Sequence, residues 1–180
     1  QRGGEIVKQI LTFARGMEGK RIVLQVKHII SETEKILGET LPKSIAIGRQ
    51  WEPNLRPIVG DATQLQQVLM NLCINARDAM PQGGKLEISA KNACIEDNEK
   101  NHPGVRPGDY VLLAVKDSGT GIPPEIIDKI FDPFFTTKEP GKGTGLGLAT
   151  VLGIVKSHGG FVEVKSKVDK GTTFQVYLPA

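Results

Sequence analysis

The strongest chemical signal in this 180-residue sequence is a glycine-rich segment in its C-terminal part. Glycine occupies every second position from Gly141 to Gly147, and the segment leads directly into a predicted helix. Backbone amides that no side chain covers, together with the positive end of a helix, form an anion site suited to a polyphosphate. A flexible linker is the alternative, but a linker would not run straight into a helix with an apolar face, here Leu146, Leu148, Val151, Ile154 and Val155.

A second group of candidate residues shares one helix, predicted over residues 62–80. Its apolar positions recur at helical spacing and must face a core: Leu65, Val68, Leu69, Leu72, Cys73, Ala76 and Met80. Beside them runs a polar stripe with steps of four, four and three: Gln67, Asn71, Asn75 and Asp78. Such oxygens are ligands that Mg²⁺ accepts, with waters and substrate phosphates completing its octahedron. An ordinary solvated helix face is the alternative.

Asp117 is the third candidate, because it ends an apolar predicted strand and is followed by Gly119 and Gly121. A carboxylate fixed there can accept a hydrogen bond from an exocyclic amino group, and the glycines let a flat base approach the backbone. Adenine carries such a group. Taken alone, however, an aspartate followed by glycines is also typical of a plain turn.

Composition and missing motifs exclude several classes of function. The chain lacks the P-loop pattern, and no dinucleotide-binding glycine motif follows an early strand. Aromatic residues make up 5%, and the net charge of +3 is not gathered in a basic block, so we expect no nucleic-acid binding. No apolar run is long enough to span a membrane, so we expect no direct membrane contact. Two cysteines without a C-x-x-C motif indicate neither zinc nor a disulfide framework, and favour a cytoplasmic location.

The order of predicted elements indicates an α+β fold, a two-layer sandwich in which helices cover one face of a mixed, mostly antiparallel sheet. Helices are predicted at residues 5–17, 26–37, 62–80, 124–131 and 146–157. Strands are predicted at residues 44–51, 85–91, 110–117, 161–166 and 172–178. Asp61 is placed to cap the helix at 62–80. Two loops are long, a polar connection at residues 92–109 and a Gly/Thr/Lys-rich loop at 132–145 that we expect to be a mobile lid.

Four of these segments, in order, resemble the N box, first glycine box, F box and second glycine box of sensor histidine kinases. They are NLCINARDA at 71–79, DSGTG at 117–121, FDPFFTTK at 131–138 and GKGTGLGL at 141–148, and GTTF at 171–174 resembles the last glycine-threonine element. The resemblance covers residues 58–180. It implies the α/β sandwich shared with gyrase, heat-shock chaperone ATPases and MutL, with ATP between the N-box helix and a lid.

The resemblance also implies roles for single residues. Asn75 would ligate Mg²⁺, and Asn71 would support the ion directly or through water. Asp117 would read the adenine amino group, with Thr172 assisting near the base. The other residues that the motifs implicate in ATP binding are Arg77, Asp78, Gly119, Gly121, Ile122, Phe131, Thr137, Lys138, Lys142, Gly143, Thr144, Gly145, Leu146, Gly147 and Leu148.

One position departs from the family pattern. Many members carry lysine three residues after the second N-box asparagine, where this chain has Asp78. A cation facing the phosphates would then come from Arg77, Lys138 or Lys142, and the sequence does not choose among them.

The same resemblance implies that the chain has two parts. Residues 1–18 resemble the tail of the second helix of the family's dimerisation and phosphoacceptor hairpin, and residues 19–180 the catalytic domain. An ordinary packing helix is the alternative for this tail, since its periodicity suits both. The acceptor motif is a histidine followed by an acid, and none of His28, His102 and His158 has an acid next to it. His158 is predicted to end a helix.

The function implied is that of an ATP:protein-histidine phosphotransferase in a two-component system. It would transfer the γ-phosphate to a histidine of a hairpin that this chain lacks. Its expected partners are that hairpin, in a homodimer, and the receiver domain of a response regulator. The alternative is a conformational ATPase of the gyrase, chaperone and MutL type, which the histidine-kinase form of residues 131–138 disfavours, as does the absence of a transducer domain after the last strand.

Overall fold

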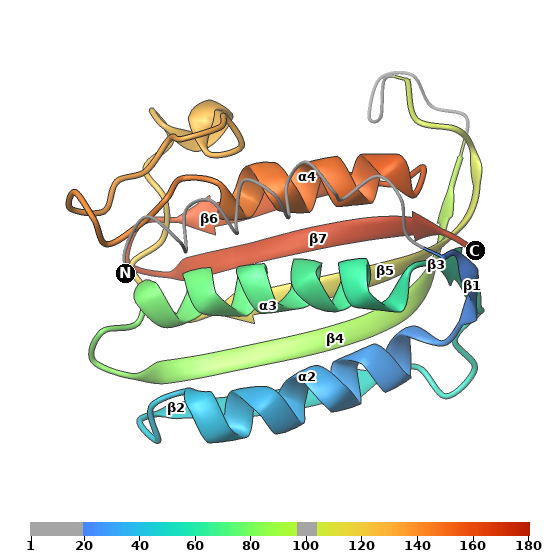
Figure 1. The fold of residues 1–180 in the computed structure, drawn as a ribbon, viewed down its shortest axis with the longest axis horizontal. Coiled ribbons are helices and arrows are strands. Elements are labelled where there is room, and N and C mark those ends of the chain that lie inside the picture. Colours follow the sequence, from blue (N-terminus) through green and yellow to red (C-terminus); the bar gives the residue numbers. More distant parts are fainter. Residues whose placement is uncertain (1–19, 97–103) are drawn as a thin grey trace.

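The computed structural model describes residues 20–96 and 104–180, which form a layer of sheet and a layer of helices (Figure 1). Five strands form the main sheet in the order β2-β4-β5-β7-β6. Their bounds are β2 Ile45–Trp51, β4 Gly84–Ile95, β5 Gly108–Asp117, β6 Phe161–Lys167 and β7 Gly171–Pro179. Only the β2–β4 pair is parallel among them, and the other pairs are antiparallel. The expected mixed, mostly antiparallel sheet is confirmed.

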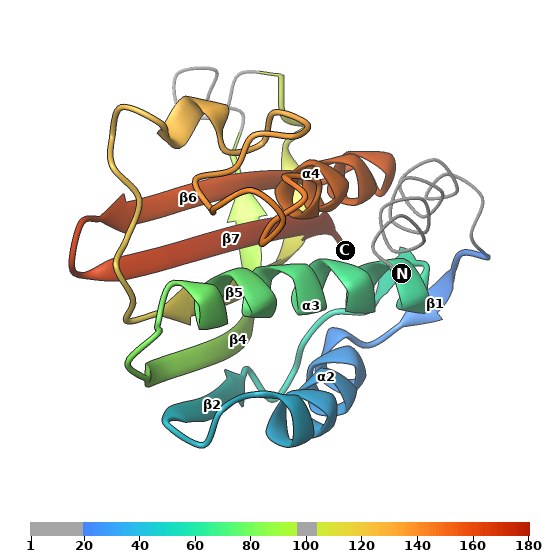
Figure 2. The same ribbon diagram turned by 60° about the vertical axis from the view of Figure 1, so that its left-hand side comes forward.

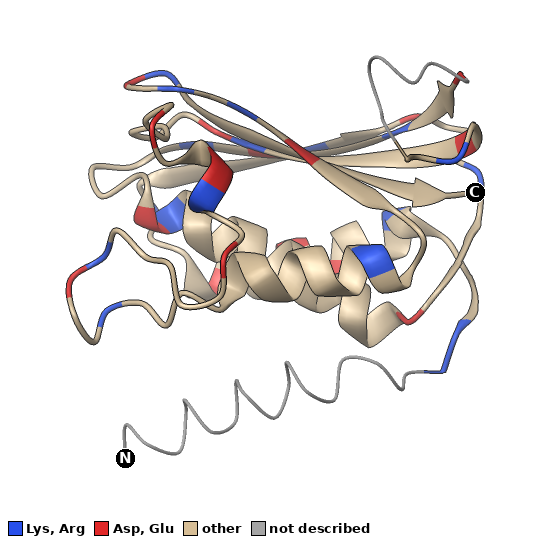
Figure 3. Cartoon of the chain, turned by 90° about the horizontal axis from the view of Figure 1, so that it is seen from above, with Lys and Arg blue, Asp and Glu red and all other residues tan. Residues whose placement is uncertain are grey.

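Three helices cover one face of this sheet, as Figures 2 and 3 show from two further directions. They are α2 (Val26–Thr40), α3 (Ala62–Asp78) and α4 (Gly147–Ser157). The apolar residues of their inner faces and of the alternate sheet positions form one continuous core. Figure 3 also shows the positions of the charged residues scattered along the ribbon of the described elements. The predicted two-layer sandwich is therefore the observed one.

Helix α3 is central because it lies between α2 and α4 and carries the predicted polar stripe. The Asp61 carboxylate caps it as predicted, accepting a hydrogen bond from the Gln64 amide at 2.9 Å. Its apolar stripe is buried in the core, and burial raises the pKa of the Cys73 thiol to about 12. The helix ends at Asp78, two residues before the predicted end, and the peptide groups of Ala79 and Met80 close its last turn.

His158 connects the end of α4 to the start of α3. It lies at the end of α4, as predicted, and is buried. Its Nδ1 contacts the Ile154 carbonyl at 2.8 Å, while its Nε2 accepts a hydrogen bond from the Asp61 amide at 3.1 Å. The start of α3 is thereby tied to the end of α4.

Two expectations about elements were wrong, and one small sheet was not predicted. The connection predicted at residues 92–109 is shorter at both ends, because β4 continues to Ile95 and β5 starts at Gly108. The β4 extension contains polar residues that interrupt its strand pattern: the Asn92 backbone amide donates a hydrogen bond to Oε2 of Glu52 at 3.0 Å, and its Nδ2 donates one to the Asn54 carbonyl at 2.8 Å. Two three-residue strands, β1 (Ile22–Leu24) and β3 (Ile58–Gly60), were not predicted and form a separate small sheet. They are too short to show an alternating pattern.

The second wrong expectation is the helix at residues 124–131. Only one 3₁₀ turn, η1 (Ile127–Lys129), forms there. Its hydrogen bonds join residues three apart, from Ile126 to Pro123 and from Lys129 to Ile126, which is the tighter 3₁₀ spacing. The segment takes this shape because Ile130 is buried in the core and Phe131 packs against it. The helix predicted at residues 5–17 lies outside the described residues.

Candidate nucleotide-binding site

A cavity of about 880 Å³ opens between α3, the adjoining ends of β5 and β7, and the long segment that runs into α4. Almost all residues that the sequence implicated in ATP binding line it; the exceptions are Gly119 and Phe131. The three motif regions thus meet in space although Asp78 precedes Asp117 by 39 residues and Asp117 precedes Gly141 by 24 residues along the chain. A volume of this size is in the usual range for a site that takes a nucleotide-sized ligand.

One end of the cavity is built around Asp117. Its Oδ1 accepts hydrogen bonds from the amides of Gly119 at 2.8 Å and Thr172 at 3.3 Å. Burial raises the pKa of the Asp117 carboxyl above its ordinary value, although these two hydrogen bonds oppose the rise. Oδ2 has no hydrogen-bond partner among residues 20–96 and 104–180. An acceptor with a fixed direction is therefore left for a ligand.

Neighbouring strands hold this end in place. Thr172 faces Asp117 across the β5–β7 pair, and its hydroxyl lies 2.8 Å from the hydroxyl of Ser166 on β6. The Ser166 hydroxyl also accepts a hydrogen bond from the Ile122 amide at 2.8 Å, which anchors the segment after Asp117. Gly119 lies against the carbonyl of Ala79 at the end of α3, which explains why it does not line the cavity.

The polar stripe of α3 faces the cavity, not open solvent. Gln67, Asn71 and Asn75 all line it. The Asn71 Nδ2 donates a hydrogen bond to the Gly147 carbonyl at 3.2 Å, which links α3 to the first residue of α4. The N-terminal amides of α4 and the glycine-rich segment lie in the same cavity wall. Two carboxamides therefore stand beside an anion-binding helix end.

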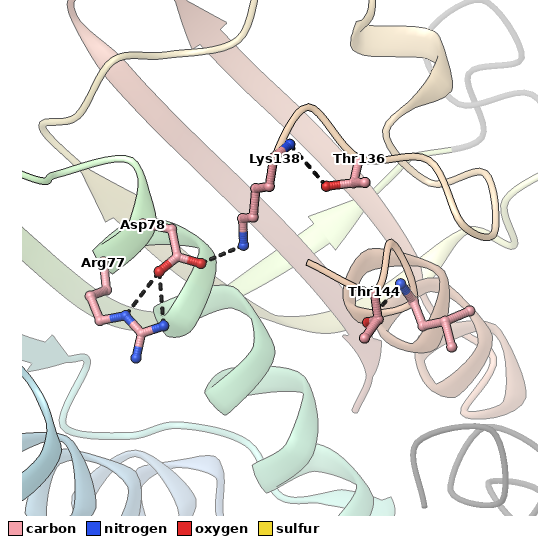
Figure 4. A network of polar contacts seen from close by, with 6 residues as sticks. Arg77, Asp78, Thr136, Lys138 and Thr144 are labelled. Carbon is pink, nitrogen blue, oxygen red and sulfur yellow. Dashed lines mark hydrogen bonds and ion pairs between the residues drawn. The ribbon is translucent and has the colours of Figure 1, made fainter. Parts of the chain in front are cut away.

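A network of charges spans the cavity between α3 and the lid, as Figure 4 shows. The Asp78 Oδ1 accepts from Nε and Nη2 of Arg77 at 2.9 and 2.8 Å, and its Oδ2 contacts Nζ of Lys138. Burial alone would raise the pKa of Asp78, but the hydrogen bonds and charges of Lys138 and Arg77 outweigh it and lower the pKa. Lys142 instead pairs with Glu139 at 2.6 Å within the lid.

The two ends of the lid meet at a neck, where Phe134 and Gly145 are hydrogen-bonded to each other. The Phe134 amide donates a hydrogen bond to the Gly145 carbonyl at 3.0 Å, and both residues have positive φ, 66° and 68°. Phe131 lies behind the cavity wall, where its ring meets that of Phe174 edge to face at 6.3 Å. Phe174 itself lines the cavity, so Phe131 acts as its support.

Sequence reasoning missed part of the lining. Much of the apolar lining comes from residues to which the sequence assigned no role, inside and outside the motifs, and the β6–β7 turn adds two residues: Ile74, Pro123, Ile126, Ile130, Phe135, Val168, Asp169 and Phe174. The turn is brought in by a hydrogen bond from the Asp169 amide to the Thr120 carbonyl at 2.8 Å. No local pattern signals such a long-range contact. Gln67, by contrast, was visible as the first residue of the polar stripe.

A cavity between a helix that covers a sheet and a lid is typical of one class of protein. This class is the catalytic domains that bind a nucleotide in that place. The family model described as "Histidine kinase-, DNA gyrase B-, and HSP90-like ATPase" matches residues 60–180. The chain belongs to this family, and within it to the catalytic ATP-binding domains of two-component sensor histidine kinases. The expected family and fold are thereby confirmed.

Three relatives illustrate the membership. Sensor kinase CckA of Brucella abortus is 43% identical over 179 residues, which is 99% of this chain and 19% of that protein. The full-length ShkA structure with AMPPNP matches with a TM-score of 0.78 and 25% identity, covering 97% of this chain and 35% of ShkA. The isolated catalytic domain of histidine kinase ThkA matches at 0.71 and 30%, covering 89% and 97%. ThkA in complex with response regulator TrrA matches at 0.74 and 27%, covering 99% and 47%.

The chain spans about a fifth to a quarter of the length of the curated relatives it matches first, 19% and 26%. Within residues 20–96 and 104–180, no helix has the length and apolar character needed to cross a bilayer.

Proposed function

We propose that this chain binds ATP with Mg²⁺ in the cavity and presents the γ-phosphate to a histidine on a separate dimerisation hairpin. The observation that supports this most is that one cavity joins the Asp117 carboxylate to the glycine-rich start of α4. A group that reads an amino-bearing base and a group that binds a polyphosphate are thus at the two ends of one site.

The orientation of the nucleotide follows from these two ends. The adenine amino group donates to the unpaired Oδ2 of Asp117, while Ile122 and Phe174 contact the apolar faces and edges of the base. The triphosphate extends to the amides of residues 143–147. The relative ShkA was crystallised with AMPPNP, which supports an adenine nucleotide as the ligand.

The residues present fit a magnesium ion that is shared with the nucleotide. Mg²⁺ keeps several waters and takes one or two protein oxygens plus substrate phosphates. Asn75 would supply one such oxygen, and Asn71, whose Nδ2 is held by Gly147, would support it directly or through water. When bound, the ion neutralises charge on the phosphates and stabilises the charge that develops in transfer.

Phosphoryl transfer then needs little covalent chemistry from this chain. A neutral imidazole nitrogen of the hairpin forms a bond to the γ-phosphorus while the bond from that phosphorus to the β–γ bridging oxygen breaks, and ADP leaves. No general base is needed, because the nucleophilic nitrogen has a free electron pair. The chain contributes alignment of the phosphate and shielding by residues 132–145.

The partners follow from the same proposal. We assign residues 1–18 to the tail of the hairpin and residues 19–180 to the catalytic domain. The hairpin is the dimerisation element of a homodimer, and its phosphohistidine passes the phosphoryl group to the receiver domain of a response regulator. The complex of relative ThkA with response regulator TrrA supports such a partner. The phosphotransfer takes place in the cytoplasm.

The test supplies labelled ATP and Mg²⁺ to the chain, alone and with the separately produced hairpin of the same protein. We expect acid-labile label on the hairpin and none on the chain, because exposed His28 is not followed by an acid and His158 is buried. Transfer should be weak, since the native tether raises the effective concentration. Label on a histidine of the isolated chain, or none on the hairpin, would refute the proposal.

A further inference from the structure

Asp78 connects the nucleotide cavity to the lid in a way that the motifs do not explain. It is the last residue of α3, and its two carboxylate oxygens bind different cations, Arg77 of the same helix and Lys138 of the lid (Figure 4). The three residues line the same cavity. The charge network therefore forms part of the cavity wall between helix and lid.

The Lys138 side chain is also held along its length. A Cβ placed on Gly143 would lie 2.8 Å from Cδ of Lys138, so the lysine stem lies directly on the glycine-rich segment. The backbone amide of Lys138 is held by the Thr136 hydroxyl at 3.1 Å. The stem of Lys138 therefore lies beside the amides that would bind phosphate, and its ammonium contacts Asp78.

The charges of the network add to +1, because one carboxylate is shared by a guanidinium and an ammonium. The side chains of Asp78 and Lys138 are 26% and 33% exposed, so water screens them less than a typical surface pair. The pKa of Asp78 is lowered despite its burial, which keeps the carboxylate ionised at neutral pH. An isolated carboxylate would repel a triphosphate at this place, but this one carries two cations with it.

We propose that Asp78 is a positioning residue that holds the Lys138 ammonium over the glycine-rich segment, where it binds the nucleotide polyphosphate. The lid then supplies the cation, and α3 supplies its anchor. The inference rests on the proposed ATP site and adds to it, because it selects Lys138 among the three candidate cations and gives Asp78 a role in polyphosphate binding.

The pair of Glu87 and Lys116 serves as a matched control. It also joins two separate elements, β4 and β5, but its atoms are 3.7 Å apart and its side chains are 58% and 63% exposed. Neither residue lines the cavity. Exposed pairs of this kind contribute little to stability, so Glu87→Gln should change neither nucleotide affinity nor the fold.

The experiment measures binding of ATP, ADP and AMP to the 180-residue chain by calorimetry. Lys138→Met should weaken ATP and ADP binding about tenfold, since a charge-assisted hydrogen bond to phosphate is lost, and should leave AMP binding nearly unchanged. Asp78→Asn should weaken ATP binding about threefold to tenfold, because the ammonium is no longer held in place. In the Lys138→Met background, Asp78→Asn should cause no further loss.

A rescue experiment separates positioning from a merely structural role. Asp78→Lys combined with Lys138→Met places the cation on α3 itself and should regain at least half of the lost ATP affinity on a logarithmic scale. Thermal melting checks that each variant is folded. Tighter ATP binding by Asp78→Asn, equal losses in both backgrounds, or equal losses for AMP and ATP would overturn the inference. If the unchanged chain binds no ATP, the proposed function fails, not this inference alone.

Discussion

The two ends of the nucleotide cavity are built in different ways. At the Asp117 end, Asp117 and Thr172 are 5% and 4% exposed, and paired strands fix their backbones. At the lid end, Lys138 and Lys142 are 33% and 73% exposed, and residues 132–146 belong to no helix or strand. We therefore expect the first end to be in place before a ligand arrives and the second to adapt to one.

This difference suggests a division of labour. A fixed acceptor such as the Asp117 carboxylate selects its ligand, because a base that offers a carbonyl instead of an amino group would leave two acceptors facing each other. A loop outside helices and strands can capture and release a ligand, since its opening breaks no helix or strand. Selectivity should therefore reside at the sheet end, and capture of the phosphates at the lid end.

Asp117→Asn should give the largest change in affinity, a roughly hundredfold weaker ATP complex. Its Oδ1 keeps the bonds to the amides of Gly119 and Thr172, so the new amide group takes the Oδ2 position and points a donor at the adenine amino group. Calorimetry with ATP and GTP measures both the loss of ATP affinity and the preference for ATP over GTP. The unchanged chain should reject GTP, and equal affinities for the two nucleotides would remove Asp117 from the site.

The same variant should be more stable than the unchanged chain at neutral pH in the absence of nucleotide. Burial raises the folded-state pKa of Asp117 above the unfolded value, so folding disfavours the ionised form. This penalty is present above the folded pKa and disappears as the pH falls below the unfolded one. Thermal melting at a series of pH values should show the advantage of Asp117→Asn shrinking in acid, and a constant advantage would contradict the raised pKa.

Two glycines test the comparison through the backbone. Gly121 and Gly145 have φ of 71° and 68°, and an added Cβ would lie 2.2 Å from the Lys167 carbonyl oxygen and 2.4 Å from the Phe134 carbonyl carbon. Gly121→Ala should lower the free energy of unfolding by about 2–4 kcal/mol, since it strains the sheet end. Gly145→Ala should spare most of that stability but weaken ATP binding about tenfold by opening the lid neck.

Gly153→Ala is the control for both, because an added Cβ meets nothing within 4 Å and the site lies inside α4. It should stabilise the chain by about 1 kcal/mol through helix propensity alone. Thermal melting and calorimetry compare the three variants. If Gly121→Ala and Gly145→Ala lower the free energy of unfolding by the same amount, the two ends of the site do not differ in rigidity.

Asn75→Ala addresses the region between the two ends. If Asn75 is a magnesium ligand, the variant should bind ATP about tenfold more weakly in Mg²⁺ and change little for metal-free ADP, since the lost oxygen acts through the ion. Calorimetry with and without Mg²⁺ separates the cases. Equal losses would reassign Asn75 to packing or to a direct phosphate contact.

The parts of the site that sequence reasoning found are those with a local signature. The spacing of Asn71, Asn75 and Asp78 already places them on one helix face, and glycine at alternate positions up to Gly147 already predicts exposed amides. The same holds for the main strands, whose alternation is a property of consecutive residues.

The parts that it missed depend on contacts between distant segments. Lys138 and Asp78 are 60 residues apart, and nothing in either segment predicts that they pair. Phe174 enters the cavity wall only because β7 lies next to β5. The predicted helix at 124–131 gave way to a 3₁₀ turn for the same reason, since burial of Ile130 outweighed local propensity.

The smallest expected effect is a change of lid motion without any change in fold. Hydrogen exchange of amides at residues 135–144 should be fast in the free chain, because no helix or strand protects them. ATP with Mg²⁺ should slow it several-fold as phosphates bind the amides and Lys138. Amides of β5 and β7, including that of Thr172, should exchange slowly in both states, since paired strands protect them.

AMP is the sharper control, because it fills the Asp117 end without reaching the lid and should leave residues 135–144 unprotected. Protection of the lid that is already high without ligand, or that AMP confers as well as ATP, would mean that both ends of the cavity are equally preformed.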